Sequence, residues 1–338
     1  MADRYLVATG NYGDVNTWSA TDGGAAGASV PTSSDNVHFT ANSNGLTLTV
    51  NVTGNSYDFV ADVANTATID GSSLLRIYGD MTLHANMTFS KTGIINWYAT
   101  DDGKVLTSAG LTFACILNIQ GGTKSFGDAI TLSGSSYFNL LTGTLDTNDQ
   151  TVTNADYWNG GAGGVSTLIL GASVINCKGW SMGTGVNLTI TAGTSSIRVT
   201  GAGIFDGGGK TYYEVQLNGT AHTISGSNTF NKLVLNPAGV QTITWTDTST
   251  QSIGSMRRSG TGLITFAGSG TAEWAITKIG SGVIKLYNVS ISYSTVTPRE
   301  RIWFASGNSV DGGNNIGWIF GKGEGSGLIS ILKAMRAL

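Results

Sequence analysis

The sequence has little charge, little proline and almost no cysteine. Only 12% of its 338 residues are charged, half of the ~25% usual in soluble domains. The net charge of −3 leaves no basic surface of the kind that nucleic-acid binding requires. The two cysteines, Cys115 and Cys177, stand in apolar runs typical of strands. We therefore expect buried free thiols rather than a disulfide framework.

Long apolar runs are also missing. No stretch reaches the ~18 consecutive apolar residues of a membrane-spanning helix, so we expect no membrane insertion. The first residues, MADRYLVATGNYG, lack the basic and then apolar layout of a signal peptide. We expect a protein that is assembled in the cytoplasm of a cell rather than exported by that route.

Short alternating segments that end at Gly or Asn fill most of the chain. They are rich in Val, Ile, Leu, Thr and Tyr, with apolar residues at every second position, which predicts strands. The segments are 46–55, 74–80, 115–122, 166–172, 187–193, 196–203, 212–219, 231–239 and 282–292. The 49 glycines supply the backbone freedom that sharp bends between strands require.

The segments recur at roughly 20 to 25 residues, a period typical of solenoids. A sandwich or barrel also consists of many short strands. Three features favour a parallel β-helix. The repeats vary gradually along the chain and show no clear end, charged residues are scarce, and no long connection separates the segments. Stacked coils would then bury Val, Ile and Leu in inward ladders and present Thr, Ser and Asn outward.

The two ends of the chain differ from its middle. Residues 1–45 are predicted to form an N-terminal cap and residues 46–302 the β-helix. A C-terminal aromatic cap follows at 303–320, and 321–338 combines a flexible linker with a short amphipathic helix. The predicted structural cap residues are Trp18, Trp303, Phe304, Asp311, Trp318 and Phe320. The predicted docking residues of the helix, toward a partner subunit or a neighbouring protein, are Leu328, Ile331, Leu332 and Met335.

Carboxylates of the kind that glycosidases use are scarce. The chain has four glutamates, and most aspartates stand beside Gly, Asn or Thr, where Asp forms turns. Asp101 and Asp102 are adjacent, so on a strand they would point to opposite faces. We expect no catalytic residues and no enzyme activity.

Metal and cofactor sites are not predicted either. His38, His84 and His222 are far apart and lack metal-ligand spacing. The segment GAGIFDGGGK (201–210) resembles a calcium-binding nonapeptide but occurs once, which favours a turn. The loop NSVDGGNNIGW (308–318) contains one carboxylate, Asp311, whereas calcium takes six to eight oxygen ligands. We interpret that loop as a run of tight turns.

Aromatic residues beside turns are the remaining functional signal. Aromatic faces stack on sugar rings and anchor protein interfaces. The candidates for contact with a glycan or a partner are Trp97, Tyr98, Tyr157 and Trp158, although core packing is the alternative for each of them.

The segments GDVNTWSATDGGAAGASVPTSSDNVHF (13–39) and ISYSTVTPRERIWFASGNSVDGGNNIGWIF (291–320) are similar to Gly/Thr-rich proteins of tailed bacteriophages and prophages. The resemblance extends over about residues 1–320 and is specific at the two ends. It implies a right-handed β-helix and a structural role in the virion, and it brings no set of catalytic residues. The segment 328–338 lies outside it.

The expected function is accordingly that of a phage virion protein, most directly a tail-associated fibre, spike or tip that contacts the host surface. A capsid decoration or head-fibre protein and a β-helical polysaccharide depolymerase are the alternatives. A bacterial surface adhesin is disfavoured because no export signal is seen. The expected partners are other virion proteins, further copies of the chain in a homotrimer, and host surface polysaccharide. The expected location is the virion.

Overall fold

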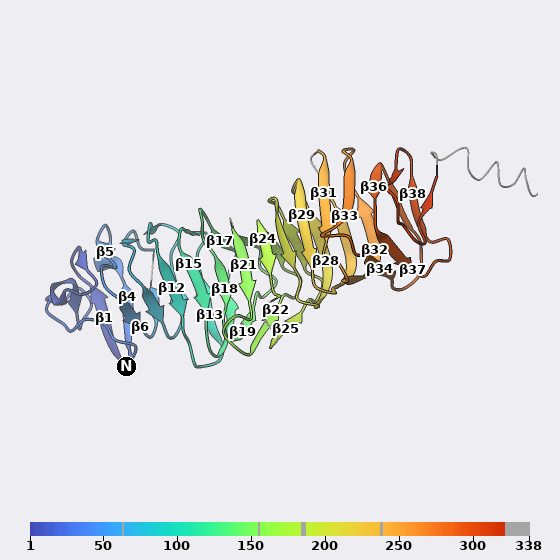
Figure 1. The fold of residues 1–338 in the computed structure, drawn as a ribbon. Helices are drawn as coiled ribbons and strands as arrows, with labels where there is room; N and C mark the ends of the chain where they lie inside the picture. Colours follow the sequence, from blue (N-terminus) through green and yellow to red (C-terminus); the bar gives the residue numbers. More distant parts are fainter. Residues whose placement is uncertain (63, 155, 184–186, 237–238, 322–338) are drawn as a thin grey trace, which may run out of the picture. The chain divides into compact units, whose positions relative to one another are not determined.

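The computed structural model describes residues 1–62, 64–154, 156–183, 187–236 and 239–321. It is all-β and divides into two compact units: unit 1 takes residues 1–177 and 184–195, and unit 2 takes 178–183 and 196 onward (Figure 1). Each unit is a parallel β-solenoid, because its strands pair in parallel with strands about one coil away in sequence. The predicted fold class is confirmed. The right-handed sense, which is the rule for parallel crossovers, stays a prediction.

Unit 1 begins with strands that already belong to its largest sheet. In hydrogen-bonded order this ten-stranded sheet contains β25 (Leu188–Thr191), β22 (Ser166–Ile169), β19 (Gly143–Asp146), β16 (Thr123–Phe126), β13 (Lys104–Thr107), β10 (Met81–Thr82), β7 (Phe59–Ala61), β4 (Asp35–Phe39), β1 (Ala2–Leu6) and β3 (Trp18–Ser19). Among the described strands the pair β1–β3 is antiparallel, and the other pairs are parallel. The 3-10 helix η1 (Val15–Thr17) directly precedes β3, and the 3-10 helix η2 (Ala41–Ser43) follows β4.

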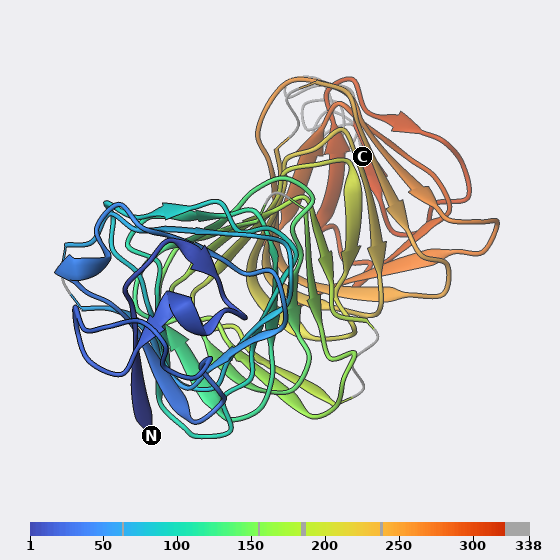
Figure 2. The same ribbon diagram turned by 90° about the vertical axis from the view of Figure 1, so that its left-hand side faces the viewer.

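The other sides of the unit 1 coils are formed by three shorter rows of strands. One contains β11 (Thr88–Phe89), β8 (Thr68–Asp70), β5 (Thr47–Thr49) and β2 (Gly10–Asn11). A second contains β14 (Thr112–Phe113), β17 (Ile130–Leu132), β20 (Val152–Asn154) and β23 (Val174–Cys177). The third contains β21 (Tyr157–Gly160), β18 (Phe138–Leu140), β15 (Ile116–Ile119), β12 (Ile94–Trp97), β9 (Leu75–Ile77) and β6 (Gly54–Ser56). Figure 2 looks onto the N-terminal end of unit 1 and shows its coils winding around a common centre.

Unit 2 has three rows of strands. The first contains β24 (Gly179–Ser181), β27 (Gly203–Asp206), β29 (Ala221–Ser225), β31 (Gln241–Trp245), β33 (Ile264–Gly268), β36 (Val289–Ile291) and β39 (Val310–Asp311). The second contains β26 (Ser196–Val199), β28 (Thr211–Leu217), β30 (Thr229–Leu235), β32 (Thr250–Arg258), β34 (Trp274–Lys278) and β37 (Ser294–Thr297). The third contains β35 (Ile284–Tyr287), β38 (Trp303–Ser306) and β40 (Ile319–Phe320).

All nine segments predicted as strands contain strands. The segment 46–55 breaks into β5 and β6, and 282–292 breaks into β35 and β36 at Asn288, whose φ is +51°. Asn tolerates this left-handed conformation better than most residues, so the bend falls there. The very short strands, such as β10 with two residues, are not visible as alternation in the sequence.

The core consists of apolar ladders, as predicted. In unit 1 one ladder passes through five consecutive coils and is fully buried: Leu75, Ile95, Leu117, Phe138 and Trp158. In unit 2 a corresponding ladder contains Ile197, Val215, Leu233 and Met256. Each rung packs on the rungs above and below, because in-register parallel strands lie only ~4.8 Å apart.

The predicted cap residues have defined places. Trp18 is fully buried in β3, packs edge-on against Tyr12 and donates to the carbonyl of Tyr12 at 2.9 Å. Trp303 in β38 is fully buried and packs edge-on against Trp318, with ring centroids 5.4 Å apart. Phe304 and Phe320 are half-buried.

Asp311 supports the turns of the loop 308–318. One carboxylate oxygen accepts hydrogen bonds from the backbone of Gly313 at 3.0 Å and from the side chain of Asn315 at 2.6 Å. Gly313, Asn314 and Gly317 in this loop have positive φ angles. The predicted helix with Leu328, Ile331, Leu332 and Met335 lies outside the described residues.

Unit 1 contains two buried lysines that the strand pattern of the sequence does not predict. Lys91 and Lys124 are fully buried, and their ammonium groups donate to backbone carbonyls at bends of the chain. Lys124 reaches the carbonyls of Ala99 at 2.9 Å and Gln120 at 2.7 Å, and burial lowers its pKa to about 8. These cations satisfy carbonyl groups that a tight coil cannot pair with its own backbone.

His222 is a buried titratable group in the core of unit 2. It lies in β29, and its Nε2 accepts a hydrogen bond from the backbone N–H of Gly219 at 3.0 Å. Burial lowers its pKa to about 4. The imidazole is therefore neutral at pH 7, and protonating it would both remove an acceptor and place a charge in the core.

We predict that acid unfolds unit 2 partly through His222. In the unfolded chain His222 takes up a proton below its ordinary pKa of ~6.5, whereas in the folded chain it stays neutral down to about pH 4. This contribution, of up to about 3 kcal/mol, is present at pH 7 and is lost as the pH falls from 6.5 to 4. Urea denaturation at pH 7 and pH 4.5 should show that His222→Leu loses less stability on acidification than the wild type.

The matched control is Ile243→Val, at the residue that pairs with His222 on the next coil. This variant removes a methyl group without removing a titratable group. Its free energy of unfolding should therefore lie below that of the wild type by the same amount at both pH values. An equal response of His222→Leu and the wild type to acid would contradict the assignment.

Candidate functional site

The four predicted contact aromatics divide between the core and the surface. Trp97 and Trp158 are fully buried, so the interpretation of these two residues as surface contacts is wrong. Trp97 aligns with Ile77 and Ile119 in the core and donates to the carbonyl of Gly79 at 2.8 Å. Side chains alternate along a strand, and a tryptophan at an inward position fills the coil.

The two tyrosines beside these tryptophans point outward. Tyr98 follows Trp97 and is 40% exposed, and Tyr157 precedes Trp158 and is half-buried. Both flank the outer face of the row β6, β9, β12, β15, β18 and β21, whose strands lie side by side in Figure 1.

A ladder of asparagines runs along the middle of this outer face. It contains Asn96, Asn118, Asn139 and Asn159, which are in register on four consecutive strands and half-buried. Each side-chain NH2 donates to the Oδ1 of the asparagine on the preceding coil, at 2.9, 2.8 and 2.9 Å. The amides therefore form one chain of hydrogen bonds that crosses from coil to coil.

Tyrosines lie on both sides of the row of strands that carries the ladder. Tyr98, Tyr137 and Tyr157 stand two residues from a ladder asparagine, whereas Tyr57 and Tyr78 lie on the two coils before the ladder begins. On one side Tyr57, Tyr78 and Tyr98 follow β6, β9 and β12, and the rings of Tyr78 and Tyr98 lie 5.6 Å apart. On the other side Tyr137 and Tyr157 stack with ring centroids 6.4 Å apart and planes 18° apart. We call the surface formed by these five tyrosines and the four asparagines the Asn–Tyr face.

Charge gathers at one border of this face. The hydroxyl of Tyr57 donates to Asp101 at 2.6 Å, and the ammonium of Lys104 lies 4.9 Å from the centre of the Tyr57 ring. The interaction with Tyr57 raises the pKa of Lys104. Asp101 and Asp102 are exposed there. Within the amide row itself the neighbouring charged residue is Arg76, which aligns with Asn96.

The aspartates near this border hold the coils together. Asp58 accepts a hydrogen bond from the backbone of Asp80 at 2.7 Å, and Asp80 accepts one from Val105 at 2.7 Å. Asp102 accepts one from Thr123 at 2.8 Å. Each bond joins a turn to the next coil, which agrees with the interpretation of these aspartates as turn residues.

The histidines do not assemble a metal site in the part of the chain that the structure describes. No cluster there contains three His, Cys, Asp or Glu side chains arranged to hold a metal ion. His38 lies between Asp3 and Asp62, with N···O distances of 3.1 Å to each, and stacks on Tyr5. In the segment 201–210, β27 ends at Asp206, and Gly208 and Gly209 turn the chain with positive φ.

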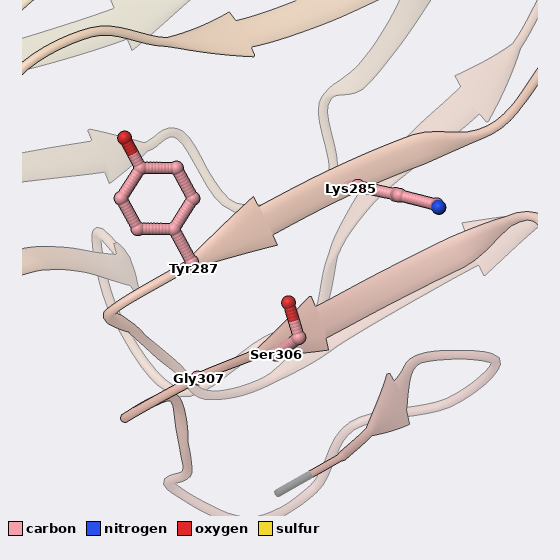
Figure 3. A pocket seen from close by; sticks show the side chains of 4 residues that line it. All are labelled: Lys285, Tyr287, Ser306 and Gly307. Carbon is pink, nitrogen blue, oxygen red and sulfur yellow. The ribbon is translucent and has the colours of Figure 1, made fainter. Parts of the chain in front are cut away.

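A shallow hollow of about 320 Å³ in unit 2 is lined by Lys285, Tyr287, Ser306 and Gly307 (Figure 3). Its polar groups are largely engaged by the fold. The hydroxyl of Ser306 donates to the carbonyl of Leu286 at 3.2 Å. Arg258, stacked 4.6 Å from the ring centre of Tyr287, donates to the carbonyls of Tyr287, Asn288, Gly260 and Gly262. The main polar group that the hollow offers to a ligand is therefore the ammonium group of Lys285.

The asparagine ladder has a signal in the sequence that becomes visible only when the segments are aligned. An asparagine between apolar neighbours recurs at 96, 118, 139 and 159, and the hydrogen-bonded pairs are 22, 21 and 20 residues apart. Aligning the segments on their inward residues would have placed these amides in one row.

Comparisons with protein-family models, curated proteins and solved structures found no match to this sequence. In the described residues, no helix is long and apolar enough to cross a membrane.

We predict that substitutions at two adjacent residues change stability by very different amounts. Trp97→Ala should lower the free energy of unfolding by about 3–5 kcal/mol, because it empties a core position. Tyr98→Ala, one residue later on the outer face, should change it by less than about 1 kcal/mol. Thermal or urea denaturation of the two variants measures both values. Similar losses for both would contradict the assigned inward and outward orientations.

Proposed function

We propose that this chain is a structural protein of a bacteriophage virion, a tail-associated fibre, spike or tip whose coils form a stiff scaffold. The observation that carries the proposal is the parallel solenoid of each unit, in which successive coils are hydrogen-bonded and apolar ladders pass through five coils of unit 1 and four coils of unit 2. The resemblance of segments 13–39 and 291–320 to phage proteins is the reason for proposing the virion as the place where this scaffold works.

Five carboxyl groups of the described chain suit a structural role better than the acid role in a depolymerase. A glycosidase needs a carboxylic acid whose pKa is raised. Hydrogen bonds to the charged form lower the pKa of five carboxyl groups in the described part of the chain: Asp3, Asp22, Asp35, Glu214 and Asp247. Glu214, for example, is bonded to Lys232 and Gln216.

The partners in this proposal are other virion proteins and further copies of the chain. Soluble homo-oligomers usually form closed symmetric assemblies, and a trimer is the form we favour. The outer faces of the coils in this assembly would meet the host cell.

The test is quantitative mass spectrometry of purified virions of the phage whose genome encodes this chain, together with antibody labelling in electron micrographs. We expect a few copies in each particle and label at the tail. Label distributed over the head, with copies in proportion to the capsid protein, would replace the tail assignment with capsid decoration. Absence of the chain from intact particles would refute the proposal.

A further inference from the structure

We propose that the Asn–Tyr face of unit 1 is a binding site for a neutral polysaccharide. It rests on the proposed function only for the source of the glycan, the host surface, because the binding chemistry belongs to the face itself. Three properties of the face support this inference: its amides have hydrogen-bonding groups that the ladder does not use, tyrosines border it, and it carries little charge.

The amides retain capacity for hydrogen bonds outside the protein. An asparagine side chain has two N–H donors and an oxygen with two lone pairs. Asn118 uses one donor toward Asn96 and one lone pair toward Asn139, and Asn139 is engaged in the same way between Asn118 and Asn159. Each interior rung therefore keeps one N–H and one lone pair, on a side chain that is partly exposed.

This pattern matches the hydroxyl groups of sugars. A hydroxyl is both a donor and an acceptor, so it can bond to the free N–H of one amide and the free lone pair of another. The ladder holds all its amides in one orientation, which means that the face does not have to order them when a ligand binds. Preorganised polar groups of this kind increase affinity by reducing the entropy cost of binding.

The tyrosines add apolar contact at both edges. Tyr98 is 40% exposed, and Tyr78 lies beside it on the adjacent coil. The stacked pair Tyr137 and Tyr157 borders the opposite edge. Two residues along a strand span ~6.8 Å, so a sugar over the amide row can reach a ring at the border. Aromatic rings with a polar tip suit surfaces that are apolar on one side and wet on the other.

The charge of the face indicates a neutral ligand. The four ladder residues are uncharged amides, and exposed Asp101 and Asp102 stand at one border. An acidic polysaccharide would place its carboxylates near these aspartates, where like charges repel. Arg76 and Lys104 offset part of this field, and Lys104 is already held at the Tyr57 ring.

Affinity gel electrophoresis of the full purified chain tests the inference. The probes are dextran, mannan and galactomannan as neutral polymers, and polygalacturonate as the acidic one. The double variant Asn118→Thr with Asn139→Thr removes both interior amides and keeps a strand-forming residue at each place. We expect neutral polymers to retard the wild type, and the apparent affinity of the double variant to fall about tenfold.

The matched control is Thr131→Asn, the reverse exchange on an outward row of a different side of unit 1, where Thr131 aligns with Thr112 and Thr153. It should bind as the wild type does. Tyr98→Ala supplies an independent variant should the double exchange unfold the chain, and it should also weaken retardation.

The inference would be overturned if no neutral polymer retards the wild type, if polygalacturonate retards it more strongly, or if folded face variants bind unchanged. A change in oligomeric state of the face variants without a change in retardation would also overturn it, because the face would then be a contact between copies. The purified chain is used throughout, so these results are independent of whether the chain is found in virions.

Discussion

The constraint on which the structure depends is the register between successive coils. Parallel pairing sets each residue directly beside its counterpart one coil away, so a side chain faces the core or the solvent according to its partners. Leu117 faces inward with Ile95 and Phe138, and Asn118 faces outward with Asn96 and Asn139. A shift of one residue would bring the asparagines into the core and expose the apolar ladder.

The same register explains why the low charge of the chain is compatible with a stable fold. Thr, Ser and Asn on outward rows pair with one another from coil to coil, while aspartates such as Asp58 and Asp102 accept hydrogen bonds from the backbone of the next turn. Where a bend leaves carbonyl groups without partners, a buried lysine supplies donors, as Lys124 does. Polar satisfaction is therefore achieved mainly between coils and needs few ion pairs.

The fold was predictable from the sequence because alternation and a 20- to 25-residue period are direct consequences of stacked strands. The orientation of single residues was harder to predict. Trp97 and Tyr98 are adjacent aromatics, and the sequence alone does not tell which one faces inward until the strand is aligned with Ile77 and Ile119. The asparagine ladder was missed for the same reason, since its four members belong together only after alignment. The burial of Lys124 depends on carbonyl groups that the bends of the chain place around its ammonium group. The residues next to Lys124 in the sequence do not predict this burial.

Register places a row of oriented amides on one outer face of unit 1, and we propose that this row binds sugars. A crystal structure of the full chain with a neutral oligosaccharide tests it most directly. We expect sugar hydroxyls within hydrogen-bond distance of the Asn118 and Asn139 amides, with sugar rings near Tyr98 or Tyr157. An oligosaccharide bound on another side of the coils, or a second copy of the chain seated over the asparagines, would contradict it.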